Sequence, residues 1–293
     1  MHYYIGIDGG GTKTAVRLSD ENGNTLSDIR VGRSNHADTS MEASLSLIEN
    51  SIRTVVENAR LTPDAITAVY AGIAGSTCDN YQQLCRERIL NVTVNAKVKV
   101  DNDASVLFVR LDNGDGAVLI CGTGSICFTQ KNGVRRRIGG YGELDMLGSG
   151  CDIGKMALAY TLRVIDGREK SGLLDKLIYE KNGASTLEIE ADLVRGGKPV
   201  YASFAPLVFE AYRGKDEAAV RILNDNFDFL TGYFINASQD LGNSFTAVIS
   251  GGVMRDPIAQ ALLKEKTKAA KLDISFIPAP DGAACAVDCA RQL

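Results

Sequence analysis

Hydrophobic and polar residues alternate near the start of the chain in a pattern that predicts three consecutive β-strands. Residues 3–8 form a short, mainly apolar strand, and residues 15–19 alternate between apolar and polar side chains, as a half-buried strand does. The pair Asn22-Gly23 then marks a hairpin turn, after which residues 25–31 can return as a third strand.

Apolar residues take up helical spacing after the third strand. Leu45, Ile48, Ile52 and Val55 recur every three or four residues, which predicts an amphipathic helix over residues 41–60. Shorter patterns predict a strand at 65–71, a helix at 79–90, a strand at 97–100 and a helix at 104–111. Strands that alternate with helices in this way are typical of an α/β domain.

The opening pattern recurs in the middle of the chain. A strand at 117–121, a Gly/Thr turn at 122–125, a strand at 126–130, an Asn132-Gly133 turn and a strand at 134–138 repeat the order of the first unit. An internal repeat of this kind predicts two related domains that face each other.

The second half of the chain continues with helices and two more strands. Residues 151–241 are dominated by helical spacing, and we predict strands at 245–250 and 273–277 and helices at 257–270 and 282–291. We therefore expect an N-terminal domain over residues 1–112 and a C-terminal domain over 113–293, with a helical insertion at about 151–241. Gly114 and Gly116 mark the expected crossing.

Composition and charge narrow the class of protein. The 293 residues are 45% hydrophobic and 23% charged with a net charge of −4, which gives no basic field to attract nucleic acid or a membrane surface. No apolar run approaches ~20 residues, and no leader precedes the first strand, so we expect a cytoplasmic protein. Seven cysteines without a Cys-x-x-Cys pair, together with two histidines, do not form a disulfide framework or a zinc motif.

The glycine-rich segment between the first two strands carries the first chemical signal. It is not a P-loop, because Thr12 stands where that motif needs lysine, and it is not a dinucleotide fingerprint, because a strand follows it. Backbone amides and a hydroxyl at such a hairpin tip can approach phosphate oxygens closely. Asp8, at the end of the first strand, is a suitable partner for Mg²⁺ or its water ligands. The expected ATP-binding residues of this loop are Gly10, Gly11, Thr12 and Lys13.

The second Gly/Thr turn is a weak signal by itself, and it indicates a function because it repeats the first turn. Two such hairpins on facing domains would hold one triphosphate from opposite sides, so residues Gly122, Thr123, Gly124 and Ser125 are also expected to bind ATP. Gly251 and Gly252 follow a strand and precede a helix, where they could pass under an adenine ring or ribose. An ordinary helix-entry turn explains this last pair equally well.

Six motifs occur in an order that resembles a known family. They are Asp8–Thr14, Gly72-Ile73-Ala74-Gly75, Asp103-Ala104, Gly122–Ser125, Gly139-Gly140-Tyr141-Gly142 and Ser250-Gly251-Gly252-Val253. In this order the chain resembles the BadF/BadG/BcrA/BcrD ATPase family, and within it the N-acetylglucosamine kinase branch. The resemblance implies two actin/hexokinase-like (ribonuclease H-like) domains with ATP, Mg²⁺ and a small-molecule sugar in the cleft between them. It is also compatible with a homodimer.

The resemblance assigns roles to several residues. Asp103 matches the family's catalytic aspartate, and a carboxylate there could orient a sugar hydroxyl and accept its proton. Asp101 lies two residues earlier and is the main rival. Asn35 and His36 stand where the family has an Asn-His pair with the Asn on the sugar, although a polar loop before a helix explains them nearly as well. The remaining sugar contacts that the resemblance implies are Gly140 and Tyr141.

One segment departs from the family pattern. The family usually has Gly-Asp-Glu-Gly-Ser after the glycine cluster, whereas residues 142–149 here are one residue shorter and have their acids displaced. Asp145 is the expected substitute, and the identity of the sugar stays open among N-acetylglucosamine, glucosamine, N-acetylmuramic acid and glucose.

Two other functions fit parts of the sequence. The iron–sulfur branch of the family activates 2-hydroxyacyl-CoA dehydratases and needs cysteines that bridge a cluster across a dimer, for which Cys127 and Cys151 are the candidates. A non-catalytic sugar sensor would keep the fold and lose the displaced acid. An amino-sugar kinase accounts for more of the motifs than either alternative.

Overall fold

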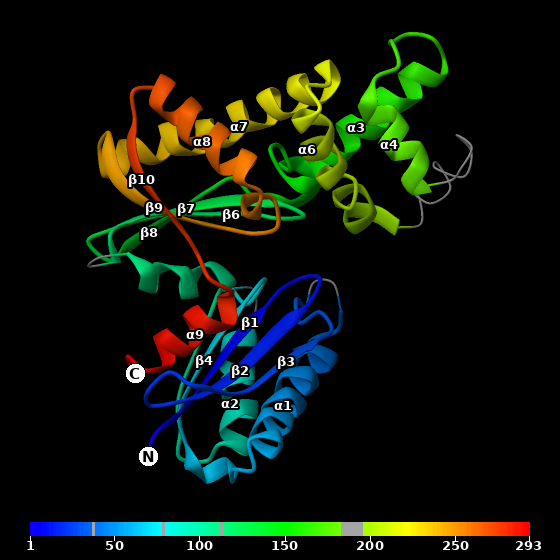
Figure 1. Cartoon of the computed structure of the whole chain (residues 1–293). Helices are drawn as coiled ribbons and strands as arrows, with labels where there is room; N and C mark the ends of the chain where they lie inside the picture. The colour runs from blue at the N-terminus through cyan, green and yellow to red at the C-terminus, as the bar shows by residue number, and fades with distance from the viewer. Residues whose placement is uncertain (37–38, 78–79, 112–113, 183–195) are drawn as a thin grey trace. The chain divides into compact units, whose positions relative to one another are not determined.

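The structure, a computed structural model, describes residues 1–36, 39–77, 80–111, 114–182 and 196–293 (Figure 1). It divides into two compact units, one made of Met1–Gly114 with Ala279–Leu293 and one made of Asp115–Pro278. The predicted boundary between residues 112 and 113 lies outside the described residues. Each unit is built around its own five-stranded sheet.

The first unit has the sheet order β3-β2-β1-β4-β5. Strand β1 pairs antiparallel with β2 and parallel with β4, so the hairpin and the following α/β crossover share one central strand. Helices α1 and α2 pack on one face, where Ile5 and Ile7 of β1 are fully buried. The strands are β1 (Tyr3–Gly9), β2 (Thr14–Asp20), β3 (Thr25–Val31), β4 (Ile66–Ile73) and β5 (Lys97–Asp101); the helices are α1 (Met41–Asn58), α2 (Tyr81–Val92) and the short 3₁₀ turns at Pro63–Ala65 and Asp103–Arg110.

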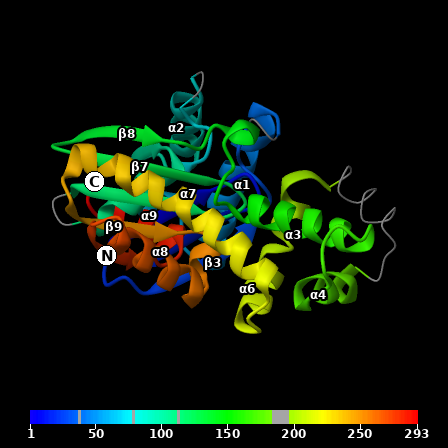
Figure 2. The ribbon, with the colours of Figure 1, turned by 90° about the horizontal axis from the view of Figure 1, so that it is seen from above.

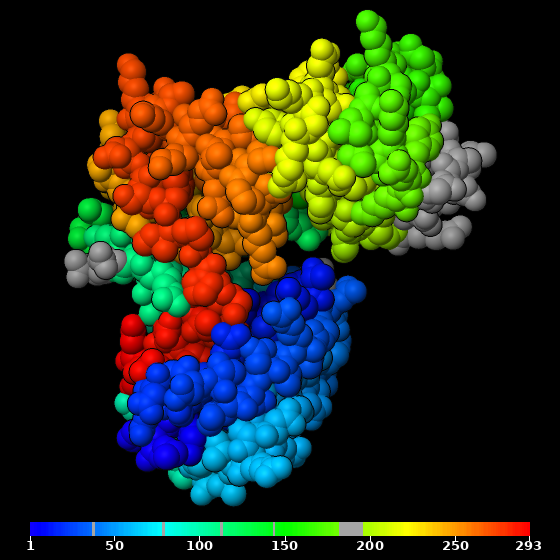
Figure 3. Space-filling model, in the orientation of Figure 1, coloured from blue at the N-terminus to red at the C-terminus, as the bar shows by residue number. Residues whose placement is uncertain are grey.

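The last helix of the chain, α9 (Gly282–Ala290), covers the opposite face of this first sheet. Side chains alternate along a strand, so Gly6 points away from Ile5 and Ile7 and toward α9. A β-carbon at Gly6 would lie 2.3 Å from the amide nitrogen of Val287 and 2.4 Å from the carbonyl oxygen of Ala283. Figure 3 shows the C-terminal residues packed against the atoms of the N-terminal strands. The sequence analysis assigned this helix to the C-terminal domain, residues 113–293. In the structure it belongs to the first unit instead, because it packs on β1.

The second unit repeats the same arrangement. Its sheet has the order β10-β9-β6-β7-β8, which is the order of the first sheet when read from the other end. As in the first unit, the central strand pairs antiparallel with the next strand of a hairpin and parallel with a later strand. The predicted internal repeat is therefore present in the sheet topology. The strands are β6 (Gly116–Cys121), β7 (Ser125–Lys131), β8 (Val134–Ile138), β9 (Ser244–Ser250) and β10 (Asp273–Pro278).

Helices in the second unit form its core with one face of the sheet. Figure 2 shows α7 running across the sheet, with α3, α4 and α6 gathered toward one end of it. Phe227, Leu230 and Phe234 of α7 are fully buried in this core. The helices are α3 (Gly150–Ile165), α4 (Leu173–Asn182), α6 (Ala205–Arg213), α7 (Glu217–Leu241) and α8 (Pro257–Ala269), with 3₁₀ turns at Gly142–Leu144 and Val253–Arg255.

Several details differ from the sequence-based expectations. The segment expected as a helix at 104–111 forms the 3₁₀ helix Asp103–Arg110. The predicted insertion at 151–241 is helical where it is described, and its residues 183–195 lie outside the described residues, as does residue 79 at the start of the helix expected at 79–90. Among the helices that the structure describes, none has the length and apolar content needed to cross a membrane.

Candidate functional site

The hairpin between β1 and β2 presents the first glycine-rich loop. The Gly10 amide donates to the Lys13 carbonyl at 3.0 Å, which closes the turn. Gly11, Thr12 and Lys13 at its tip are exposed, whereas Thr14 is buried and donates to Ser34 Oγ at 2.8 Å. The loop therefore has a fixed base and an accessible tip, as a phosphate-binding hairpin requires.

Asp8 lies at the end of β1 and faces the start of α9. A β-carbon at Gly282 would lie 2.2 Å from Asp8 Oδ2, so glycine is the residue that leaves room for this carboxylate. Burial, together with the charges of Asp103 and Asp281, raises the pKa of Asp8 to about 6, and Lys13 opposes this shift. Three carboxylates thus share one electrostatic environment in the first unit.

Asp281 is a member of this group that the sequence analysis missed. It caps the N-terminus of α9 by accepting from the Ala284 amide at 2.9 Å, and it accepts from Arg17 Nη2 at 3.0 Å. The signal for it was present, because an Asp before a helical run of small apolar residues is a typical N-cap. Its distance of more than 270 residues from Asp8 hid its place near the hairpin.

Asp8, the predicted metal residue, lies close enough to Asp103 for the two charges to interact. No group of three or more His, Cys, Asp or Glu side chains in the described part of the chain has the geometry to hold a metal by itself. Mg²⁺ commonly takes one or two carboxylates and completes its shell with water and phosphate oxygens. Burial raises the pKa of Asp8 most and the charges of Asp103 and Asp281 raise it further, and a bound cation would offset both effects by favouring the ionised carboxylate.

Asp103 is positioned by the turn that follows β5. The Asn102 side chain accepts from the Ser105 amide at 3.0 Å and caps the 3₁₀ helix, and Asp103 Oδ1 accepts from the Ala104 amide at 3.1 Å. Gly72, at the end of β4, allows this helix to approach the sheet. A β-carbon at Gly72 would lie 2.5 Å from Val106 Cγ1 and 3.5 Å from Asp103 Cα.

Asp101, the rival to Asp103, is engaged by the protein. Its Oδ1 accepts from the Asn102 amide at 2.7 Å, and the Tyr70 hydroxyl donates to its Oδ2 at 3.5 Å. Tyr70 also bonds Ser105 at 3.1 Å, which ties Asp101 to the scaffold of the turn. Both aspartates accept the amide of the next residue, and the bonds from Tyr70 are the difference between them that the structure shows.

Asn35 and His36 lie against the turn that follows β4. A β-carbon at Gly75, whose φ is +79°, would lie 2.4 Å from Asn35 Oδ1 and 3.6 Å from the His36 ring. The structure thus brings together two motifs that are about 40 residues apart in the sequence. His36 also stacks on Tyr81, with ring centroids 4.9 Å apart and an interplanar angle of 17°.

In the second unit, the two remaining glycine motifs meet. Gly251 has a φ of +101°, and a β-carbon there would lie 2.2 Å from the carbonyl oxygen of Cys121. A β-carbon at Gly122 would lie 3.7 Å from the amide nitrogen of Gly252. The Gly122–Ser125 turn and the Gly251-Gly252 pair, both expected at ATP, therefore lie side by side at the ends of β6 and β9.

The Gly122–Ser125 turn is also tied to the start of α3. The Gly150 amide donates to the Gly122 carbonyl at 2.8 Å, and the Cys151 amide donates to the Thr123 carbonyl at 3.2 Å. Ser125 differs from its neighbours, because it is buried and donates to the Leu147 carbonyl at 2.7 Å. Its hydroxyl supports the following loop, so the backbone of Gly122–Gly124 is the better candidate for phosphate contact.

The segment expected at the sugar adopts a glycine-dependent conformation. Gly139 and Gly140 have φ values of +71° and +74°. Arg137, which the sequence analysis missed, donates to the carbonyls of both glycines, and its guanidinium lies 4.9 Å from the centre of the Tyr141 ring. Tyr141 is 62% exposed, so one face of an aromatic ring held by Arg137 is available to a ligand. Asp145 follows the 3₁₀ turn and is partly buried.

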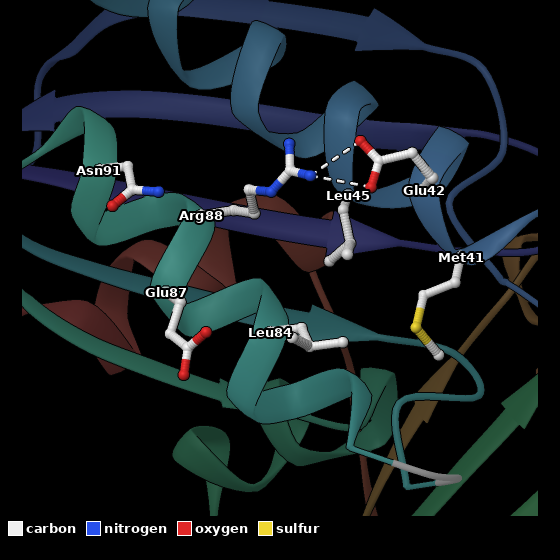
Figure 4. Close-up of a pocket in the computed structure, with 7 residues that line it drawn as sticks. All are labelled: Met41, Glu42, Leu45, Leu84, Glu87, Arg88 and Asn91. Carbon is white, nitrogen blue, oxygen red and sulfur yellow. Dashed lines mark hydrogen bonds and ion pairs between the residues drawn. The ribbon is translucent and has the colours of Figure 1, made fainter.

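A pocket outside these residues lies between α1 and α2 of the first unit (Figure 4). Its volume is about 290 Å³, and Arg88 spans it to the Glu42 carboxylate, whose oxygens are both 2.8 Å from Arg88 Nη2. None of the predicted site residues lines it. The lining residues are Met41, Glu42, Leu45, Leu84, Glu87, Arg88 and Asn91.

Comparison with known proteins gives a consistent result. The BadF/BadG/BcrA/BcrD ATPase family matches residues 5–290. The N-acetylmuramic acid/N-acetylglucosamine kinase of Clostridium acetobutylicum is 30% identical over 234 residues, which cover 77% of this chain and 76% of that protein. The N-acetyl-D-glucosamine kinase of Dictyostelium discoideum is 28% identical over 289 residues, which cover 90% of this chain and 89% of that protein.

A solved structure shares the fold over the whole chain. It is a protein from Chromobacterium violaceum that was provisionally named an N-acetylglucosamine kinase; it has a TM-score of 0.76, is 25% identical, and covers 97% of both chains. The predicted actin/hexokinase-like architecture is confirmed by this match and by the two sheets of equal strand order.

Proposed function

Because the chain belongs to the BadF/BadG/BcrA/BcrD ATPase family, we propose that it is an ATP-dependent kinase of an amino sugar. N-acetylglucosamine, phosphorylated on its 6-hydroxyl, is the first substrate to test, since two relatives over most of the chain are named for that sugar. We also propose Mg²⁺ as the metal of the nucleotide, a cytoplasmic location, and a homodimer as the assembly to test.

The observation that carries this proposal is the placement of Asp103. It begins the 3₁₀ helix after β5, close enough to Asp8 for the two charges to interact, and Asp8 ends the strand that leads into the glycine-rich hairpin. A carboxylate for a hydroxyl and a carboxylate for the nucleotide's metal are thus neighbours in the first unit. Phosphoryl transfer needs these two groups close together, because its catalysis depends on positioning and on charge stabilisation.

Each predicted residue has a role that its surroundings permit. Asp103 would orient the sugar hydroxyl and accept its proton. The exposed tip of the β1–β2 hairpin and the backbone of Gly122–Gly124 would donate amides to phosphate oxygens. Asp8 would contact the metal or its water ligands, and the metal, when bound with ATP, would neutralise charge on the phosphates. The Tyr141 ring would pack against the C–H face of a pyranose.

The role of an iron–sulfur activator is less supported. Each of the described cysteines is buried, and burial raises the pKa of Cys127 to about 12. A cluster that bridges a dimer needs thiolates at a surface, and a buried thiol with a raised pKa is a poor ligand donor. Cys127 is buried and alternates with half-buried residues within β7, which fits a core position.

A coupled ADP-release assay with a panel of sugars tests the proposed function. The panel contains N-acetylglucosamine, glucosamine, N-acetylmuramic acid and glucose, each with Mg-ATP. We expect turnover that depends on one or more amino sugars, with the phosphate on the product sugar. ADP release without any sugar would instead favour an ATP-driven activator, and sugar binding without ADP release would favour a sensor.

A further inference from the structure

The segment that carries Asn35 and His36 is anchored by buried hydrogen bonds at Ser34. The Ser34 amide donates to the Gly10 carbonyl at 3.1 Å, and its hydroxyl accepts from Thr14 at 2.8 Å. Its carbonyl accepts from the hydroxyl of Ser44 in α1. The start of the segment is therefore fixed both to the base of the glycine-rich hairpin and to the first helix.

Tyr81 extends this network to α2. It is the first residue of that helix and is fully buried, and its hydroxyl oxygen lies 2.6 Å from Ser44 Oγ. Ser44 has one hydroxyl hydrogen, which it gives to the Ser34 carbonyl, so the Tyr81 hydroxyl must be the donor to Ser44. The order Tyr81, Ser44, Ser34 is thus a directed chain of hydrogen bonds that ends beside Asn35.

The ring of Tyr81 fixes the His36 imidazole as well. The two rings are nearly parallel, at 17°, with centroids 4.9 Å apart, which is an offset-stacked geometry. Ser44 holds the hydroxyl at the far end of the Tyr81 ring, and the ring is fully buried, so both ends of the ring are fixed in position beside the imidazole. Burial raises the pKa of Tyr81 and keeps the hydroxyl neutral, and therefore a donor, at ordinary pH.

His36 has one ring nitrogen that the described protein does not satisfy. Its Nδ1 is buried, and no residue among those described forms a hydrogen bond with it. A buried polar atom without a partner is costly, and natural proteins keep such atoms mainly where a ligand or water completes the bond. Asn35 is adjacent, and both residues contact the Gly75 turn.

We propose that Tyr81 is a positioning residue for sugar recognition: stacked on His36 and anchored through Ser44 to Ser34, it holds the imidazole so that Nδ1 meets a hydroxyl or amide group of the sugar. This inference rests on the proposed sugar kinase function. It adds a residue that does not touch the substrate, and it gives His36 a hydrogen-bonding role of its own beside Asn35.

A double-mutant cycle tests whether Tyr81 acts through His36. In Tyr81→Leu the stack is lost, and we expect the sugar KM to rise about tenfold while the ATP KM stays unchanged, because one buried hydrogen bond to the sugar is weakened. In Tyr81→Phe the stack remains without its anchor, and a rise of about two- to fivefold is expected. His36→Ala should raise the sugar KM at least as much as Tyr81→Leu does. In the His36→Ala background, both changes at Tyr81 should have no further effect on the sugar KM.

A matched control separates positioning from loss of packing. Ile89→Ala removes a fully buried side chain of the same helix α2, and it should lower thermal stability with little change in the sugar KM. An equal rise of the sugar KM in Ile89→Ala, or additive effects of the Tyr81 and His36 substitutions, would overturn the proposal. If Tyr81→Leu does not fold, the cycle with Tyr81→Phe decides the matter in the same way.

Imidazole NMR separates this inference from the proposed function. The protein has two histidines, so a His2→Gln variant assigns the His36 ring signals directly. Tyr81→Leu should remove the ring-current shift of His36, whereas Ile89→Ala should retain it. If no sugar is turned over but this shift behaves as expected, the kinase function fails while the stack stands. If sugar is turned over and the shift does not change in Tyr81→Leu, the positioning role fails alone.

Discussion

Replacing Asp8 by asparagine should stabilise the protein in the absence of metal and nucleotide. The carboxyl has its pKa raised from 3.8 to about 6 in the folded chain, chiefly by burial and then by the charges of Asp103 and Asp281. The folded state therefore binds the Asp8 proton more tightly than the unfolded state does. Its favourable contribution is complete below pH 3.8 and is lost as the pH rises through about 6.

The size of the effect follows from this shift. A pKa difference of about two units corresponds to about 3 kcal/mol in the free energy of unfolding above pH 6. Asparagine has nearly the same shape and carries no charge, so Asp8→Asn should gain about this amount at pH 7.5 and about half of it at pH 5. At ~2–4 °C per kcal/mol, the Tm at pH 7.5 should rise by roughly 6–12 °C.

Thermal melts in EDTA at the two pH values provide the measurement. Asp20→Asn is a suitable control, because hydrogen bonds from Asn24, Asn22 and Gly23 lower the pKa of Asp20. The ionised Asp20 carboxylate therefore stabilises the folded state above the pKa that it has in the unfolded chain, and this contribution is lost as the pH falls. Asp20→Asn should accordingly lower the Tm at pH 7.5. An Asp8→Asn gain that is absent, or that is equal at pH 5 and pH 7.5, would refute the electrostatic reasoning. With Mg-ATP added, the wild type should gain more Tm than Asp8→Asn does, since a cation relieves the same repulsion.

Four further substitutions probe the chemistry and the glycine motifs. Asp103→Asn should lower kcat by about 10²–10⁴-fold with little change in sugar binding, whereas Asp101→Asn should retain most of the activity; the reverse result in ADP-release kinetics would make Asp101 the base. Gly251→Ala should raise the ATP KM and lower the Tm, because its β-carbon would lie 2.2 Å from the Cys121 carbonyl oxygen at a φ of +101°; unchanged melting and ATP kinetics would contradict the close approach. Asp145→Ala should cost about 1.5–3 kcal/mol in sugar binding, seen as a higher sugar KM at constant ATP KM, and an unchanged sugar KM would remove Asp145 from the site.

Local patterns predicted the two sheets well, because each strand and turn is encoded by neighbouring residues. The strands at 25–31 and 134–138 have the predicted bounds, and the repeat of Gly/Thr hairpins corresponds to a repeat of sheet order. Local patterns could not predict which unit α9 packs on, because a helix of small apolar residues can pack on either sheet. The one local clue was Gly6, which has no side chain where α9 crosses β1.

The candidate site shows the same division between local and distant signals. Asp8 and the glycine-rich turns stood out because unusual residues cluster within a few positions. Asp281 and Tyr81 did not, because their importance depends on partners far away in the chain. Tyr81 looks like an ordinary core residue at the start of a helix until His36 is found 4.9 Å from its ring. Partial resemblance to a family cannot supply such residues when they lie outside its motifs.

The closing of the first unit by α9 has a consequence for biosynthesis. The five strands of that unit are complete by Asp101, but the face of β1 at Gly6 is covered only when residues 279–293 have been made. The whole of Asp115–Pro278 must be translated in between, which takes roughly 10–30 s at ~5–20 residues per second. During this interval the face of the nascent first sheet that α9 will cover stays open, while the second unit is continuous and can fold as it leaves the ribosome. The first unit is therefore completed last, although its strands are made first.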